Sequence, residues 1–177
     1  MDNIQLDKII KSDFTTSQYF LGVFAADRLP RNVKYPCALI VNSDEISKPG
    51  THWFAIFIDK FGNGEYFDSF AVKPWVTHHI RFLNKVSRVW KYNTVCLQNI
   101  YSSKCGQYCA LYIAMRSRGF SMHDIVTKIN KSDSVATDRN LIKMYKSIYS
   151  SKFNFSVDVY TNKSEICQHC RPFVYLP

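Results

Sequence analysis

The sequence has no apolar run that approaches the roughly 18 to 20 residues needed to span a bilayer. Its start, Met1-Asp-Asn-Ile-Gln-Leu-Asp-Lys8, lacks the charged-then-apolar pattern of a secretion signal. It also has no internal repeat, low-complexity stretch or linker. At 177 residues, of which 46% are hydrophobic, the chain can bury one substantial core. We therefore expect a single domain over 1–177, outside the membrane, not secreted and in a reducing compartment.

Acidic side chains are scarce relative to basic ones. There are 14 Asp and Glu against 23 Lys and Arg, which gives a formal net charge of +9. This balance favours an acidic partner such as nucleic acid, although a generally basic protein without such a partner fits equally well. Two helical stripes gather this charge: Arg81, Lys85 and Arg88, and Arg139, Lys143 and Lys146. They could contact DNA phosphates, or they could be solvated helix faces.

The cysteines do not predict disulfides, because nothing in the sequence points to export. Six are present: Cys37, Cys96, Cys105, Cys109, Cys167 and Cys170. Cys167-Gln-His-Cys170 offers half of a zinc-ligand pattern, but no second ligand pair follows or precedes it at a fitting spacing, so we expect no metal. We expect Cys109, one helical turn after Cys105, to be a buried packing residue.

Hydrophobic periodicity predicts both helices and strands. The helices are expected over 4–12, 75–90, 105–118, 122–130 and 137–149, and the strands over 37–41, 53–58, 65–68, 94–98 and 153–160, before an irregular tail over 161–177. In the second helix, His79, Leu83, Val86 and Trp90 fall on one face.

Two of these strands form a hairpin that places a histidine beside a carboxylate. The turn residues 59–64 connect the strand over 53–58 with the strand over 65–68. Pairing across this turn brings His52, just before the first strand, and Asp68, at the end of the second, to the same end of the ladder. We expect Trp53 to pack behind His52.

The stretch from Gln98 to Met115 carries Cys105 into a run that is apolar nearly all round. In a helix, Cys105 lies in the first turn, where unpaired N–H groups and the macrodipole favour a thiolate. A cysteine hydrolase needs a thiolate, an imidazole, a group that orients the imidazole, and donors for the oxyanion. His52, Asp68 and Gln98, with the N–H of Cys105, are the candidates. Each residue type alone is more often structural, and their joint placement is what favours catalysis.

Four motifs follow one another in the order His, acid, Gln, Cys-Gly: Gly50-Thr-His52-Trp53, Tyr66-Phe-Asp68-Ser69, Gln98, and Ser103-Lys-Cys105-Gly106. This order resembles the adenovirus-type cysteine endopeptidases, which belong to a clan that includes the SUMO and ubiquitin-like-protein proteases. The likeness covers 19–119. The motifs are most similar to those of homologues encoded by Polinton-type elements and related DNA viruses.

The resemblance implies an α+β, papain-like fold in which a central helix bearing the nucleophile packs on a mixed β-sheet with flanking helices. It implies Cys105 as nucleophile, His52 as general base, Asp68 as the group that orients His52, and Gln98 in the oxyanion hole. The reaction implied is peptide hydrolysis through a thioester acyl-enzyme, with no cofactor required for the chemistry. In the adenovirus branch the acid is usually Glu, and Asp is common in the wider clan.

The resemblance also implies partners. The substrates would be capsid and core precursor polypeptides cleaved at glycine-containing sites, in the virion and the infected host cell, by a monomeric enzyme. DNA and a viral peptide are implied activators; Cys96 is the candidate thiol for such a peptide, although its spacing from Gln98 does not match. Two alternatives stay open: an isopeptidase that acts on host ubiquitin-like conjugates, and a non-catalytic basic binding module.

Overall fold

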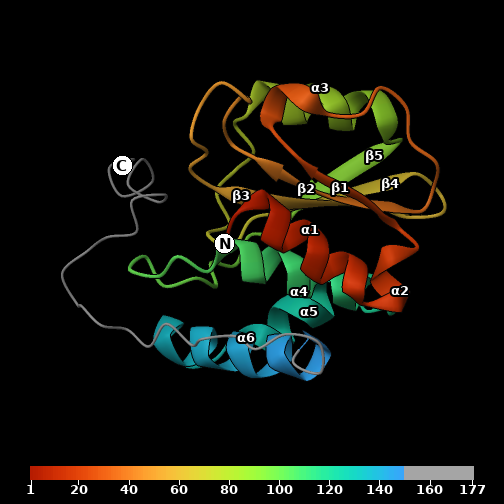
Figure 1. Ribbon diagram of the computed structural model, residues 1–177. Helices are drawn as coiled ribbons and strands as arrows, with labels where there is room; N and C mark the ends of the chain where they lie inside the picture. The colour runs from red at the N-terminus through yellow and green to blue at the C-terminus, as the bar shows by residue number, and fades with distance from the viewer. Residues whose placement is uncertain (150–177) are drawn as a thin grey trace.

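The computed structural model describes residues 1–149, and in this range helices flank a single sheet (Figure 1). The elements in order are α1 (Asn3–Ser12), α2 (Phe14–Ser17), β1 (Phe20–Phe24), the 3-10 helix η1 (Ala26–Arg28), β2 (Cys37–Asn42), β3 (Trp53–Ile58), β4 (Asn63–Phe67), α3 (Thr77–Val86), β5 (Val89–Tyr92), α4 (Cys105–Ser117), α5 (Met122–Ile129) and α6 (Ser134–Tyr149). None of the helices in residues 1–149 is both long enough and apolar enough to cross a membrane.

The sheet is mixed, with the strands in the order β1-β2-β3-β4-β5. The two outer pairs, β1 with β2 and β4 with β5, are parallel, whereas the central pairs are antiparallel. Helix α3 covers one face, and α1 and α4 cover the other, with α5 and α6 beyond α4 (Figure 1). This arrangement confirms the predicted α+β class, with a central helix on a mixed sheet, and it is consistent with a papain-like fold.

Both faces of the sheet are buried, so the protein has two apolar cores. In β2, Ala38 and Ile40 belong to the core shared with α1, α4, α5 and α6. Leu39 and Val41 belong to the core shared with α3. This explains why the sequence of β2 is a continuous apolar run instead of an alternating one, since side chains on successive residues point to opposite faces.

Helix α4 lies at the centre of the larger core. Ten of its residues are buried, including all those from Tyr108 to Met115, as expected for a helix that is apolar all round. Its far end is tied to the sheet by Arg116, whose Nε donates to Glu65 Oε2 on β4 at 2.6 Å. Near its start, a Cβ added to Gly106 would lie 3.2 Å from Leu6 Cδ2, so a larger residue there would require the Leu6 side chain of α1 to shift by a few tenths of an ångström.

Two predicted elements are wrong. The helix over 75–90 is shorter, because α3 ends at Val86 and Val89–Tyr92 forms the edge strand β5. His79, Leu83 and Val86 share a buried face as predicted, whereas Trp90 lies on the strand. Residues 94–98 form a loop, not a strand. The predicted strand over 153–160 and the cysteines of the tail lie outside the described residues.

Candidate active site

The hairpin of β3 and β4 brings His52 and Asp68 together. His52 immediately precedes β3 and Asp68 immediately follows β4, and the register that pairs Ala55 with Phe67 places both at one end of the ladder. His52 Nε2 lies 2.7 Å from Asp68 Oδ1, and neither side chain is exposed to solvent. Phe54 and Phe70 pack against the imidazole, with ring centroids 4.6 and 5.3 Å away. The ring is therefore held in place on several sides.

The carboxylate of Asp68 is itself fixed by its own loop. Its Oδ1 accepts a second hydrogen bond, from the backbone N–H of Phe70 at 3.0 Å, and Oδ2 accepts one from the N–H of Val72 at 3.0 Å. With His52, three donors converge on the two oxygens. A carboxylate in this setting has one orientation, and it presents a negative charge to the imidazole.

Asn93 holds the backbone of Asp68. Its Oδ1 accepts from the N–H of Asp68 at 2.8 Å, and its Nδ2 donates to the carbonyl oxygen of Asp68 at 2.7 Å. Asn93 is buried in the loop after β5. No sequence pattern singled it out, because the partner that makes it important is 25 residues away.

We predict that Asn93→Ala lowers the free energy of unfolding by about 1 to 3 kcal/mol, because it leaves the buried N–H of Asp68 unpaired. The carbonyl oxygen of Asp68 loses one of its two hydrogen bonds and keeps the one from the N–H of Ala71. Urea unfolding measures the change. The matched control is Asn84→Ala, which removes an exposed hydrogen bond from Trp90 Nε1. That control should cost about 0.5 kcal/mol or less. Equal losses in the two variants would contradict the role given to Asn93.

Cys105 is the third member of the group, and it comes from helix α4 instead of from the hairpin. It is the first residue of α4 and is 4% exposed, so the positive end of the helix lies at its sulfur. Burial lowers the pKa of His52, but the charge and hydrogen bond of Asp68 raise it, and the Cys105 side chain, hydrogen-bonded to His52, raises it further. The result is a pKa of about 10 instead of 6.5. The imidazole is thus poised to hold a proton at neutral pH, with Nε2 on Asp68 and Nδ1 left for the sulfur.

Cys109 lies one turn further along the same helix and is different chemically. Its Sγ donates to the carbonyl oxygen of Trp53 at 3.3 Å. Burial, with the negative charges of Cys105 and Asp68, raises the pKa of Cys109 well above 9.0. It stays a thiol, as the packing role predicted for it requires.

Gln98 lies in the loop that precedes α4, and its side chain is 1% exposed. Its Oε1 accepts from Ser69 Oγ at 2.7 Å, and its Nε2 donates to the carbonyl oxygen of Ser102 at 2.6 Å. A carbonyl oxygen only accepts hydrogen bonds, so this contact fixes which end of the amide carries the N–H groups. The N–H end faces the turn that leads into Cys105. The Gln98 side-chain amide has two N–H protons. Within residues 1–149, its nitrogen donates to the Ser102 carbonyl oxygen.

A groove of about 520 Å³ opens next to Trp53, the residue after His52, and its lining includes none of His52, Asp68, Gln98 and Cys105. Its walls come from the start of α1, the end of β1, the loop after β2, and Trp53. Trp53 is half-buried and lines this groove, and its predicted packing behind His52 stays a prediction. The lining mixes apolar side chains with charged ones, namely Val23, Phe24, Ile46, Asp2, Asp44 and Glu45 among others.

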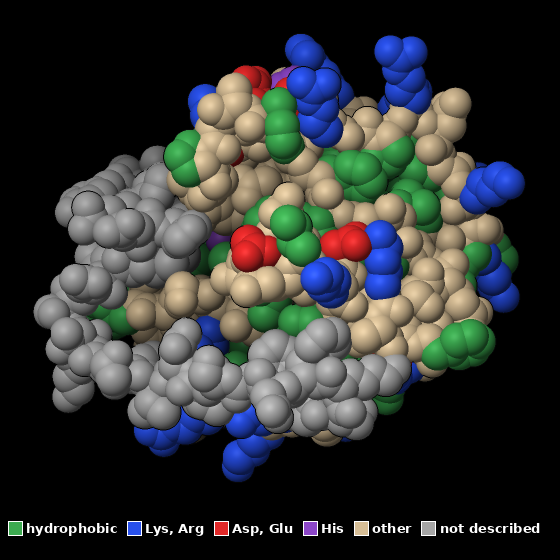
Figure 2. All heavy atoms as spheres, viewed as in Figure 1, with side chains coloured by type: hydrophobic (Ala, Val, Ile, Leu, Met, Phe, Trp, Pro, Cys, Tyr) green, Lys and Arg blue, Asp and Glu red, His purple; other side chains and the backbone are tan. Residues whose placement is uncertain are grey.

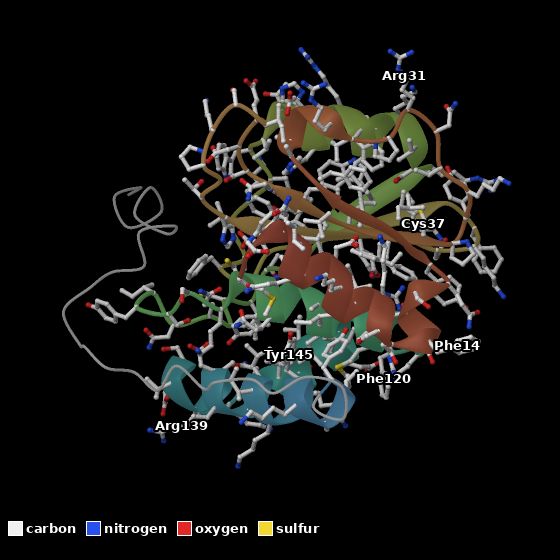
Figure 3. All side chains as sticks on the ribbon, in the orientation of Figure 1. Phe14, Arg31, Cys37, Phe120, Arg139 and Tyr145 are labelled. Carbon is white, nitrogen blue, oxygen red and sulfur yellow. The ribbon has the colours of Figure 1, made fainter. Side chains whose placement is uncertain are left out.

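The two basic stripes do not meet. Arg81 and Lys85 are exposed on α3, and Arg88 follows that helix, whereas Arg139 and Lys143 are exposed on α6. Helices α3 and α6 lie on opposite sides of the sheet, and Arg139 points away from the molecule (Figures 1 and 3). Figure 2 shows lysine and arginine side chains spread over this view instead of gathered in one patch. Each stripe would have to contact DNA separately, and Lys146, on the second stripe, is only half-exposed.

Two further thiols, Cys37 and Cys96, lie within the described residues, and the Cys96 Sγ donates to the carbonyl oxygen of Gln98 at 3.8 Å. Cys37 is buried at the start of β2 (Figure 3), and burial raises its pKa to about 12. Cys96 is exposed, two residues before Gln98. Among residues 1–149, no group of three or more His, Cys, Asp or Glu side chains is placed to hold a metal ion. The Cys167 and Cys170 cluster lies outside this range.

His79 is a second buried histidine, on α3, and its ring contacts Phe54. Its Nε2–H donates to the carbonyl oxygen of Asn42 at 2.9 Å, and the hydroxyl of Tyr66 donates to Nδ1 at 3.2 Å. Both contacts suit a neutral ring. Burial lowers the pKa of His79 to about 3 from 6.5, despite the Asn42 carbonyl, which raises it.

The low pKa of His79 predicts loss of stability in acid. Between pH 6.5 and pH 3 the unfolded chain binds a proton at His79 that the folded chain does not. This site therefore removes up to about 1.4 kcal/mol of stability per pH unit as the pH falls. Urea unfolding of the wild type and of His79→Gln at pH 7 and pH 5 measures this term. The difference in stability between the two pH values should be smaller in the variant, and an equal difference in both proteins would contradict the assignment.

Viral cysteine proteases are similar to this chain. It is 33% identical over 128 residues to a cysteine protease of African swine fever virus from a tick isolate from Malawi, covering 63% of this chain and 44% of that protein. It is 31% identical over 118 residues to a SUMO-1 cysteine protease of the same virus from a pig isolate from Kenya, covering 57% and 42%. The chain spans less than half the length of these relatives. It is a distant homologue of viral cysteine proteases, whereas adenovirus-type specificity stays a prediction.

Other comparisons add little. No protein-family model matches the sequence. Among solved structures, the central domain of the uncharacterized Lpg1148 protein from Legionella pneumophila superposes with a TM-score of 0.41 at 9% identity, covering 74% of this chain and 88% of that one. A similarity at that score carries no functional information.

Proposed function

We propose that this protein is a cysteine endopeptidase, in which Cys105, His52, Asp68 and Gln98 perform the reaction. The observation that carries the proposal is the buried chain of contacts from Asp68 through His52 to Cys105, with the His52 pKa raised to about 10. Its arrangement suits a sulfur that has given its proton to the imidazole. The homology to viral cysteine proteases supports the same reaction.

The first half of the reaction forms a thioester. The Cys105 thiolate attacks the carbonyl carbon of the peptide bond, and the carbonyl electron pair moves onto oxygen. The N–H groups of Cys105 and the Gln98 amide stabilise that oxyanion. The His52 imidazolium then donates its proton to the leaving nitrogen as the C–N bond breaks. The products of this step are a free amine, a neutral imidazole, and an acyl group on the sulfur.

The second half releases the acyl group. The neutral His52 takes a proton from a water molecule, whose oxygen attacks the thioester carbon. A second oxyanion forms in the same place and collapses as the C–S bond breaks. The product leaves as a carboxylic acid, which gives its remaining proton to solvent, and the thiolate and imidazolium are restored. Asp68 stays ionised throughout, because its part is to hold the ring and its charge.

The substrate class has two candidates. Virion precursor proteins cleaved near glycine are the first, as the resemblance to adenovirus-type enzymes implies. Conjugates of ubiquitin-like modifiers are the second, and a relative named as a SUMO-1 cysteine protease favours them. In either case, we infer that the groove lined by Trp53 receives the extended segment that precedes the cleaved bond. Trp53 is the residue after His52, and from it the groove extends along the start of α1 and the loop after β2.

Parallel assays distinguish the candidates. The purified chain is incubated with SUMO-1 and ubiquitin fusions and with peptides that contain internal glycines, each beside a Cys105→Ala control. Cleavage of the peptides supports precursor processing, and cleavage of the fusions alone supports the isopeptidase. If no substrate is cleaved and a thiol-directed probe fails to label Cys105, the protease proposal is wrong and a binding module is favoured.

A further inference from the structure

Ser69 stands next to Asp68 and contacts the other half of the proposed machinery. It is fully buried, and its hydroxyl donates to Gln98 Oε1 at 2.7 Å. Its carbonyl oxygen accepts two backbone hydrogen bonds, from Leu97 N at 2.9 Å and Gln98 N at 3.0 Å. One residue thus holds Gln98 through both its main chain and its side chain. The loop over 94–98, which forms no strand, is held in place by these contacts.

The hydroxyl of Ser69 and the carbonyl of Ser102 hold opposite ends of one amide. The Ser102 carbonyl requires the N–H end of Gln98, so Oε1 must face Ser69. The hydroxyl supplies the donor that this buried oxygen needs. Without it, Oε1 would be left unpaired in the interior, and the amide would be free to tilt about its remaining bond. A hydrogen bond accepted at Oε1 also polarises the amide and strengthens its N–H donors.

We propose that Ser69 is a positioning residue, which orients and polarises the Gln98 amide so that its second N–H is aimed at the oxyanion. This inference rests on the proposed protease function. It gives the two residues after β4 complementary tasks: Asp68 holds the base, and Ser69 holds the oxyanion donor. The end of one strand thereby sets the relative positions of two groups that reach the substrate from different loops.

The test is a double-mutant cycle of Ser69→Ala and Gln98→Ala, assayed for kcat and KM on whichever substrate the wild type cleaves. Gln98→Ala removes an oxyanion donor and should lower kcat by about 100-fold. Ser69→Ala should lower kcat by about 10-fold with little change in KM, the loss expected for a misplaced but present donor. Because Ser69 acts through Gln98, the double variant should be no slower than Gln98→Ala. Effects that multiply in full would overturn the proposal.

Two further readouts separate positioning from a general structural role. Alkylation of Cys105 by iodoacetamide needs the thiolate but no oxyanion donor, so its rate against pH should be the same in Ser69→Ala and the wild type. A peptide aldehyde forms an adduct whose oxygen occupies the oxyanion position. Its affinity for Ser69→Ala should therefore be lower than for the wild type by about the same factor as kcat. A shifted alkylation profile would mean that Ser69 acts through Asp68, and unchanged aldehyde affinity would also overturn the proposal.

Controls cover folding and activity. Ser117→Ala is the matched variant, because Ser117 ends α4 far from Cys105 and its buried hydroxyl has no hydrogen-bond partner in residues 1–149. It should keep the wild-type kcat. If Ser69→Ala does not fold, Ser69→Cys replaces it, because cysteine keeps a weak donor at this position. Its loss of kcat should be smaller than the loss of about 10-fold expected for Ser69→Ala. If the wild type cleaves no substrate, the proposed protease function fails. The contact between Ser69 and Gln98 can still be tested by NMR, because Ser69→Ala should shift the side-chain amide signal of Gln98. An unchanged signal would overturn the role proposed for Ser69 as well.

Discussion

Replacing Cys105 or His52 by alanine is expected to lower kcat by about 10⁵- to 10⁶-fold, the range found when a nucleophile or its base is removed from a hydrolase. Cys109, one turn further along α4, cannot replace Cys105, since it points its Sγ at the Trp53 carbonyl and its pKa is raised well above 9.0. His52→Ala removes the imidazole that holds the thiol proton and delivers it to the leaving amine. Progress curves at saturating substrate measure the loss.

The effects of the two replacements on kcat should not be additive in free energy. Once the sulfur is gone, the base has no proton to accept from it, so Cys105→Ala combined with His52→Ala should be no slower than either alone. Cys96→Ser is the matched control, because Cys96 is exposed and its Sγ donates only a long hydrogen bond, at 3.8 Å, to the backbone carbonyl of Gln98, for which a serine hydroxyl is also a donor. It should keep wild-type turnover and iodoacetamide labelling at Cys105. Hydrolysis that survives in Cys105→Ala would show that the nucleophile lies elsewhere.

The parts of the site that could be predicted from the sequence depend on local rules. A hairpin between apolar strands, with turn residues between them, fixes its own register, and this alone brings His52 to Asp68. The helix after Cys105 is apolar all round, so its burial and its end near Gly119, where φ is +89°, follow from the sequence. The packing of Cys105 against His52 needs the sheet and α4 to dock, and the resemblance, not the pattern, supplied that step.

The parts that were predicted wrongly or missed depend on partners distant in the chain. Residues 89–92 alternate between exposed and half-buried, which is the period of a strand, yet they follow a helical pattern closely enough to extend it. Their true state is set by pairing with β4, where Gly64 leaves room for Trp90. Asn93 and Ser69 act on groups 25 and 29 residues away, and no local pattern reports such contacts.

Replacing Asp68 by asparagine is expected to lower kcat by about 10⁴-fold, the loss seen when the acid of a triad is replaced by its amide. The charge of Asp68 raises the pKa of His52, so its removal lowers that pKa and weakens the hold on the thiol proton. The amide also fits badly, because its NH₂ group must face one of the N–H donors that now bind the carboxylate, from Phe70 or Val72. The rate of Cys105 alkylation against pH measures the change.

Asp68→Glu is the matched variant, since it keeps the charge and moves it by one methylene. The alkylation profile should stay close to that of the wild type, whereas kcat should fall by less than in Asp68→Asn, because the longer side chain loses its bonds to the loop but still orients an imidazole. If Asp68 acts through its charge, the alkylation profile changes in Asp68→Asn and not in Asp68→Glu. If Asp68→Asn left the alkylation profile unchanged, the 2.7 Å contact with His52 would be structural and not part of the reaction.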